Sequence, residues 1–167
     1  MKGRIAIVLC AALCIAGCGD RNPVKPAPLT LLDTAVLVQV RAATARVTAA
    51  KAELRLTAYL WRDFMPVSPP DGKPLAAALS ITTADSSAFP ADLRADAAWV
   101  LNGADVWATW VSETAGRAPG DPTLHVLVNG GPKWDPGTLV DVVVRLRDGS
   151  GAAWYLGVKR QTIQRTD

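Results

Sequence analysis

The chain has 167 residues, of which 50% are hydrophobic and 20% are charged, which is enough for one domain with a proper core. Its formal net charge is +3, and no basic run or stripe stands out, which argues against nucleic-acid binding. The composition includes 12 prolines and 13 glycines, so we expect many turns. It also includes six tryptophans.

The first 17 residues are typical of an export signal. Lys2 and Arg4 make a short basic start, and the uncharged residues 5–17 follow. This run is long enough for the hydrophobic part of a signal peptide and short for a membrane span, which needs about 20 residues. It ends in two small residues directly before Cys18. Removal of residues 1–17 would leave 16 basic against 15 acidic residues, a net charge near +1.

The segment Ile15-Ala16-Gly17-Cys18 resembles the lipobox of bacterial lipoproteins, an aliphatic residue and two small residues before an invariant cysteine. Leucine is commoner in that family where Ile15 stands. The resemblance covers only this leader and implies cleavage before Cys18, a thioether-linked diacylglycerol on its sulfur and acylation of the new amino terminus. Two or three acyl chains would hold the protein firmly on a membrane, since each buried CH₂ contributes roughly 0.8 kcal/mol. An ordinary secretory signal ending in a cysteine is the alternative.

The positions of the cysteines and the residue after Cys18 indicate where in the cell the protein is located. Cys10 and Cys14 would leave with the leader, so the mature domain has no disulfide and depends on its core for stability. In lipoproteins, an aspartate directly after the lipidated cysteine tends to retain the protein in the inner membrane, and here Gly19 holds that place. The resemblance thus implies a lipid-anchored cell-envelope protein. If two membranes are present, the periplasmic face of the outer membrane is favoured over the inner membrane.

Residues 18–28 comprise the lipidated cysteine and a proline-rich tether. Residues 19–28 contain three prolines and little apolar content, which argues against helix or strand. We expect a semi-rigid spacer of roughly 30 Å, at about 3.1 Å per residue. A disordered remnant without a role fits the same composition.

Residues 29–167 carry a hydrophobic period of two residues, which predicts β-strands. The predicted strands are residues 35–41, 55–61, a short piece at 80–82, two arms within 97–111, then 124–128, 139–147, 152–158 and a continuation at 161–163. A short helix competes with strand in the alanine-rich residues 42–54.

A β-hairpin is the strongest local prediction. Asn102-Gly103 separates two β-prone runs and is typical of a two-residue type I′ turn. Placing Leu101 opposite Ala104 would put Trp99 and Trp107 on opposite faces of the hairpin.

Seven or eight strands without βαβ alternation predict an all-β, antiparallel sandwich that resembles immunoglobulin-like domains by architecture only. The Cys…Trp…Cys hallmark of true immunoglobulin domains is absent. The chain therefore divides into a lipoprotein signal peptide at residues 1–17, the lipidated cysteine and tether at 18–28, and a β-sandwich domain at 29–167.

No catalytic or metal centre is predicted, and we expect no cofactor. His125 is the single histidine, and it alternates out of phase with its apolar neighbours, so it faces solvent. No G-x-S-x-G nucleophile elbow accompanies it. A histidine-based zinc site would need more ligands than the mature chain supplies. An enzyme therefore ranks behind a binding module.

The aromatic residues are the feature that indicates binding. Most tryptophans are expected to fill a core without disulfides. Four residues are candidates for binding, because aromatic residues concentrate at interface hot spots: Tyr59, Trp61, Trp107 and Trp134. Tyr59 and Trp61 share one strand face, and Trp134 lies in a loop. We expect a non-enzymatic binding or assembly module whose partner is another envelope protein. The alternative is a carbohydrate-binding module that stacks exposed Trp and Tyr on a glycan.

Overall fold

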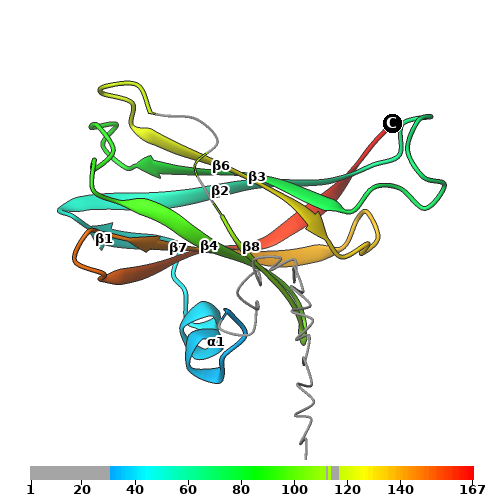
Figure 1. Cartoon of the computed structure of the whole chain (residues 1–167), viewed down its shortest axis with the longest axis horizontal. Coiled ribbons are helices and arrows are strands. Elements are labelled where there is room, and N and C mark those ends of the chain that lie inside the picture. Colours follow the sequence, from blue (N-terminus) through cyan, green and yellow to red (C-terminus); the bar gives the residue numbers. More distant parts are fainter. Residues whose placement is uncertain (1–30, 112, 114–116) are drawn as a thin grey trace, which may run out of the picture.

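The structure is a computed structural model that describes residues 31–111, 113 and 117–167. The predicted signal peptide, the lipidation site Cys18 and the tether lie outside these residues. The described part is predominantly β-strand with one short helix (Figure 1), in agreement with the all-β prediction. Its elements in chain order are α1 (Thr34–Arg41), β1 (Arg46–Ala49), β2 (Ala52–Asp63), β3 (Leu75–Thr83), β4 (Arg94–Asn102), β5 (Asp105–Trp110), β6 (Thr123–Gly131), β7 (Leu139–Arg147) and β8 (Ala153–Thr166).

The strands of the described residues form one curled sheet in the order β5-β4-β7-β8-β2-β3-β6, and β1 pairs with β2 beside this path. The curl brings β2, β3 and β6 into one layer and β4 and β7 into the other (Figure 1). The long strand β8 joins the layers, because it pairs antiparallel with β7 and, near its end, parallel with β2. This parallel pair corrects the expectation of a wholly antiparallel sheet: a register shift between Val140 and Val142 bends β8 out of one layer toward the other.

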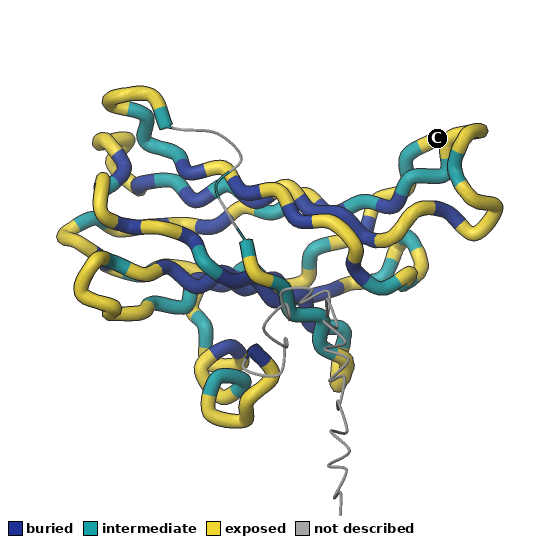
Figure 2. The backbone as a smooth tube through the Cα atoms, in the orientation of Figure 1, coloured by how far each residue is buried: buried dark blue, intermediate teal, exposed yellow. Residues whose placement is uncertain are grey.

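The main hydrophobic core lies between the two layers, and buried and exposed residues alternate along the strands (Figure 2). Leu54, Leu56 and Leu60 of β2 are buried and lie two or four residues apart, as the two-residue period requires. The same spacing holds in β7, where Val140, Val142, Val144 and Leu146 are buried. Each such side chain contributes roughly 1.5–3 kcal/mol by leaving water.

The first predicted strand, residues 35–41, is wrong: these residues form α1. The side chain of Asp33 caps the helix by accepting a hydrogen bond from the backbone N–H of Ala35 at 2.8 Å. Helical spacing turns Leu37 and Val40 toward the sheet and leaves Val38 59% exposed, which strand alternation would not do.

The helix covers the outer face of β4 and β7 and creates a second, smaller core there. The indole of Trp99 is its centre and is fully buried, and its Nε1 donates a hydrogen bond to the carbonyl of Leu31 at 2.8 Å. Sequence periodicity does not anticipate this core, because both faces of β4 are apolar.

The structure decides between the two alternatives for the alanine-rich segment and refines the register of the predicted hairpin. The alanine-rich segment contains β1 and the start of β2, since Ala50 (φ 48°) and Lys51 (φ 66°) turn the chain from one strand into the other. The predicted hairpin at β4–β5 is confirmed, but Leu101 pairs with Val106, so the loop begins at Gly103. Because the register differs by an even number of residues, Trp99 and Trp107 still lie on opposite faces.

Several predicted strands are longer in the structure. The short piece at 80–82 belongs to β3, and the predicted strands at 152–158 and 161–163 merge into the single strand β8, which begins at Ala153. The predicted strand at 124–128 is the centre of β6.

Candidate functional site

The outward side of the β2–β3–β6 layer presents apolar side chains to solvent. Tyr59 of β2, Ala78 of β3 and Leu127 of β6 pair in one row across the three strands. Within the described part of the chain this row is uncovered, since Tyr59 is 52% exposed and Leu127 is 44% exposed. We call the row, together with Trp61 and Ala76 beside it, the open face. The other layer is different, because α1 covers its outer side (Figure 1).

Two aromatic rings of the open face support each other. Tyr59 and Trp61 lie two apart on β2, so they point to the same side of the sheet. Their ring centroids are 5.5 Å apart with an interplanar angle of 28°. The neighbouring strand offers only Ala78 and Ala76 opposite these rings, so no large side chain of β3 shields them. The result is an aromatic surface in which the two rings stack on each other.

A hollow of about 400 Å³ opens beside Trp61. Asp63, Lys73, Ala76 and Asn129 also line it, so an indole, a carboxylate, an ammonium group and an amide meet there. Lys73 Nζ donates to Asp63 Oδ2 at 2.6 Å. This hydrogen bond, with a second from the backbone N–H of Met65, lowers the pKa of Asp63. The carboxylate therefore stays ionised at neutral pH.

A buried arginine next to this hollow joins two loops of the chain. Arg62 is only 3% exposed and lies on the inward side of β2. Its guanidinium donates to the backbone carbonyls of Lys73 (3.0 Å), Lys133 (3.1 Å) and Trp134 (3.3 Å), and also to that of Asp71. Sequence reasoning missed it, although the signal was present: Arg62 continues the inward phase of Leu54 and Leu60.

The other two candidate binding residues lie apart from the open face. Trp107 of β5 and Trp134 are half-buried and pack against the main core. Trp107 lies so close to Gly131 that a Cβ there would come within 2.8 Å of the indole ring, so the glycine allows this packing. The structure thus brings Tyr59 and Trp61 together and places Trp107 and Trp134 elsewhere.

The remaining tryptophans divide between core and surface. Trp99 is buried, Trp154 packs against the main core, and Trp110 is exposed. The guanidinium of Arg145 lies 5.6 Å from the ring centroids of both Trp99 and Trp110. It donates to both carboxylate oxygens of Asp96, at 2.7 and 2.9 Å. Burial by itself lowers the pKa of Arg145, but its hydrogen bonds with Asp96 and Tyr155 outweigh that effect and raise it.

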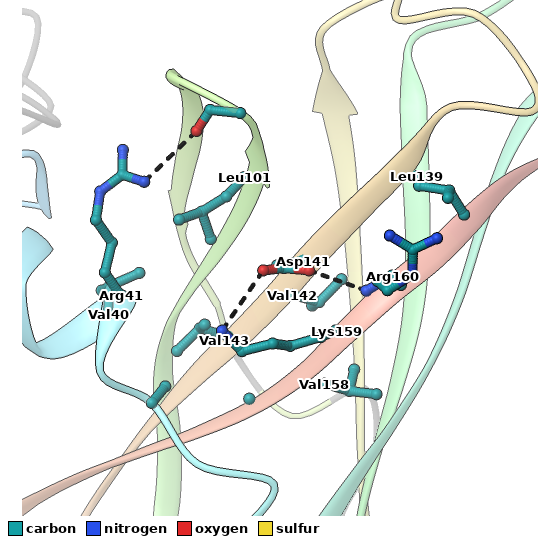
Figure 3. A pocket seen from close by; sticks show the side chains of 13 residues that line it. Val40, Arg41, Leu101, Leu139, Asp141, Val142, Val143, Val158, Lys159 and Arg160 are labelled. Atoms are coloured by element: carbon teal, nitrogen blue, oxygen red, sulfur yellow. Dashed lines mark hydrogen bonds and ion pairs between the residues drawn. The ribbon is translucent and has the colours of Figure 1, made fainter.

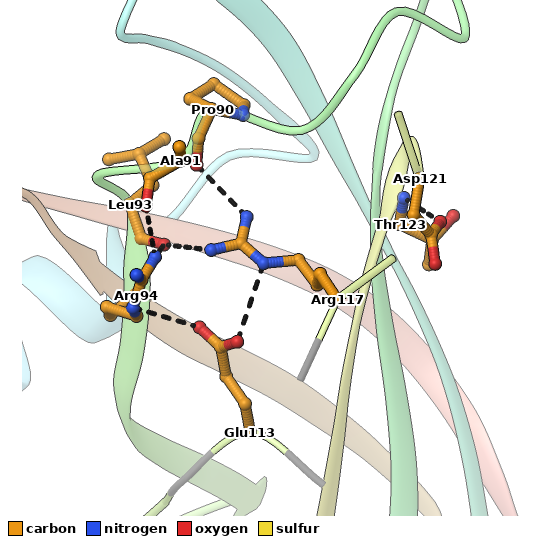
Figure 4. Close-up of polar contacts among 8 residues, drawn as sticks. All are labelled: Pro90, Ala91, Leu93, Arg94, Glu113, Arg117, Asp121 and Thr123. Atoms are coloured by element: carbon orange, nitrogen blue, oxygen red, sulfur yellow. Dashed lines mark hydrogen bonds and ion pairs between the residues drawn. The ribbon is translucent and has the colours of Figure 1, made fainter. Parts of the chain in front are cut away.

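A second arginine network closes the end of the domain near residue 90 (Figure 4). The carboxylate of Glu113 lies 3.5 Å from both Arg94 and Arg117. Arg117 also donates to the carbonyls of Pro90 (3.0 Å) and Leu93 (3.2 Å). These contacts bind one loop to another.

His125 lies on the exposed side of β6, as its alternation predicts, with Nδ1 3.0 Å from Ser80 Oγ. Among residues 31–111, 113 and 117–167, no three His, Cys, Asp or Glu side chains gather closely enough to hold a metal ion. Over those same residues, the structure contains no helix with the length and apolarity that a membrane span requires.

Comparison with known proteins identifies no family. No protein-family model matches the chain, and no curated protein matches it. A solved structure described as "X-ray structure of Northeast Structural Genomics Consortium target SoR45" is similar to this chain with a TM-score of 0.40 and 11% identity, over 66% of this chain and 86% of that one. Function is therefore inferred from the residues of this chain alone.

Proposed function

We propose that this protein is a lipid-anchored cell-envelope protein whose β-domain binds another envelope protein, without catalysis, through the open face. The observation that supports this most is the solvent-exposed row of Tyr59, Ala78 and Leu127 beside the stacked ring of Trp61. Aromatic side chains that are already ordered bind with little loss of entropy and dominate the energy of interfaces. The anchor is proposed at Cys18, with the periplasmic face of the outer membrane as the location if two membranes are present.

A carbohydrate-binding module is the second candidate, and the hollow beside Trp61 favours it. An indole ring can stack on a sugar ring, while the carboxylate of Asp63 and the amide of Asn129 can bond its hydroxyl groups. The two candidates differ in what they require of the open face. A protein partner needs the whole apolar row out to Leu127, whereas a sugar needs only Trp61 and the polar groups of the hollow.

We further propose that the domain is an immunoglobulin-like sandwich. Two layers that enclose one core support this assignment. The parallel pairing of β2 with β8 departs from the usual pattern of such domains.

Replacing Tyr59 with alanine should weaken partner binding by at least tenfold, because a truncated hot-spot residue costs more than about 1.4 kcal/mol. A photo-crosslinker at Ala78, at the centre of the exposed row, captures the partner from the native envelope in detergent. The affinity for the purified partner is then measured for the unsubstituted chain and for the Tyr59→Ala variant. The control is Val67→Ala, since Val67 is apolar and 85% exposed but lies in a loop away from the row.

The same experiment separates the two candidates. Leu127→Ser should weaken the binding of a protein partner and leave the binding of a glycan unchanged. Trp61→Ala should weaken the binding of either ligand. Equal affinities for Tyr59→Ala, Leu127→Ser and Val67→Ala would rule out the open face as the protein-binding surface.

Replacing Cys18 with alanine should release the protein from membranes or leave it as an uncleaved precursor, because the thioether-linked lipid can no longer form. Membrane fractionation and intact mass measure this. Cys10→Ala is the matched control, since Cys10 lies within the leader and should change neither result. A Cys18→Ala chain that keeps both its membrane fraction and its lipid mass would contradict the proposed anchor.

A further inference from the structure

A pocket of about 420 Å³ lies between α1 and the strands β7 and β8, on the layer opposite the open face (Figure 3). Its lining combines two kinds of side chain. Val40, Leu101 and Val143 give it an apolar wall. Gly157 also lines the pocket. A Cβ there would come within 3.2 Å of the Cβ of Ala43, so the lack of a side chain lets the segment after α1 pass close to β8.

Charged side chains surround the opening, and they are unbalanced. Of the described residues that line the pocket, Arg41, Lys159 and Arg160 are cationic and Asp141 alone is acidic. Arg41 Nη1 donates to the carbonyl of Gly103 at a long 3.5 Å, which leaves its charge without an anionic partner among the described residues. The rim therefore carries an excess of positive charge over an apolar interior.

The single carboxylate is already engaged. Asp141 Oδ1 accepts a hydrogen bond from the backbone N–H of Arg160 at 2.9 Å, and its Oδ2 lies 3.8 Å from Lys159 Nζ. Asp141 thus holds the backbone of β8 in place rather than neutralising the guanidinium of Arg160 (Figure 3).

The backbone at Arg160 is unusual. Here the register between β7 and β8 shifts, and Arg160 adopts a φ of +56°, in the left-handed region that favours glycine. Bulges of this kind redirect side chains and are found beside binding sites. Arg160 has no partner residue in the register of β7 with β8, its backbone is held by Asp141 instead, and its exposed side chain lines the pocket.

We propose that this pocket binds an anionic amphiphile, with a phosphate or carboxylate head held by the cations of the rim and an alkyl segment on the apolar wall. Val40, Leu101 and Val143 belong to the small core under α1, so an alkyl segment placed here would extend that core, while the cations of the rim would hold the anionic head. This site is separate from the open face and does not depend on the function proposed there.

The test uses the full chain in a nonionic detergent and follows backbone amide chemical shifts during titration. Dihexanoyl phosphatidylglycerol represents a membrane lipid, decanoate a free amphiphile, and inorganic phosphate the head alone. We expect saturable shifts at residues 157–160 with at least one of the two amphiphiles, and which of them binds more tightly identifies the source. Phosphate that binds as tightly as both amphiphiles, or equal shifts with zwitterionic dihexanoyl phosphatidylcholine, would overturn the proposal.

The decisive variant is Arg160→Gly, which removes the guanidinium while suiting the backbone. Binding should weaken about tenfold, yet the unfolding midpoint should not fall, because glycine accepts the positive φ. Lys51→Gly is the matched control: it also removes one cation from a positive φ, of 66°, but it lies in the β1–β2 turn. Arg41→Gln, on the exposed side of α1, provides a second test. Unchanged affinity in both Arg160→Gly and Arg41→Gln would exclude the site.

Discussion

Replacing Trp99 with alanine should lower the free energy of unfolding by about 3–5 kcal/mol, the usual range for a fully buried aromatic residue. The ring lies 5.9 Å from that of Tyr155, and its Nε1 donates to the carbonyl of Leu31 at 2.8 Å. Removing it therefore leaves a cavity and an unpaired carbonyl in the small core under α1. Urea unfolding of the full chain, followed by far-ultraviolet circular dichroism, measures the loss.

Two further variants separate packing from hydrogen bonding in this core. Trp99→Phe keeps most of the ring and loses the donor, so it should cost about 1–3 kcal/mol. Trp110→Ala removes an indole that is 45% exposed beside the same guanidinium of Arg145, and it should cost about 1 kcal/mol or less. A Trp99→Ala chain no less stable than Trp110→Ala would contradict the packing of α1 on the sheet.

Replacing Arg62 with methionine should lower the free energy of unfolding by about 3 kcal/mol, because methionine fills the space of the aliphatic stem but donates no hydrogen bond. The backbone carbonyls of Asp71, Lys73, Lys133 and Trp134 would each lose the donor that joins two loops. The urea midpoint measures the cost. Faster amide exchange at residues 71–73 and 133–134 should accompany it.

Arg55 provides the matched control, because it lies on the same strand with its side chain on the outer side. Its ion pair with Glu53, at 3.4 Å, is exposed, and such pairs contribute little. Arg55→Met should therefore cost less than about 0.5 kcal/mol. Equal costs for the two methionine variants would show that Arg62 is not what holds the loops. Because Lys73, one of the residues that Arg62 holds, lines the hollow beside Trp61, Arg62→Met should also weaken the binding of any ligand in that hollow.

The local sequence pattern was sufficient to predict side-chain orientation where one side of a strand faces the core. The inward phase of β2 and β7, the hairpin between β4 and β5, and the shared face of Tyr59 and Trp61 all follow from side-chain alternation, which neighbouring residues determine. The same alternation misled at residues 35–41, where valine and leucine also suit a helix. There the choice depends on the N-cap at Asp33 and on the apolar outer face of β4 that α1 covers.

Only part of the open face could be predicted from the sequence. Tyr59 and Trp61 could be named from one strand, but Ala78 and Leu127 join them only through the pairing of β2 with β3 and of β3 with β6. The pocket beneath α1 could not be foreseen, because it requires both the helix and the bulge at Arg160.

By itself, then, the sequence determined the all-β class and the inward side of strands such as β2 and β7, since these depend on composition and on a two-residue period. Only the tertiary structure decided the parallel pairing of β2 with β8, the side on which α1 lies and the composition of both candidate sites. The physical reason is that these features arise from contacts between segments far apart in the chain. Their energy comes from burying surfaces that no single segment contains.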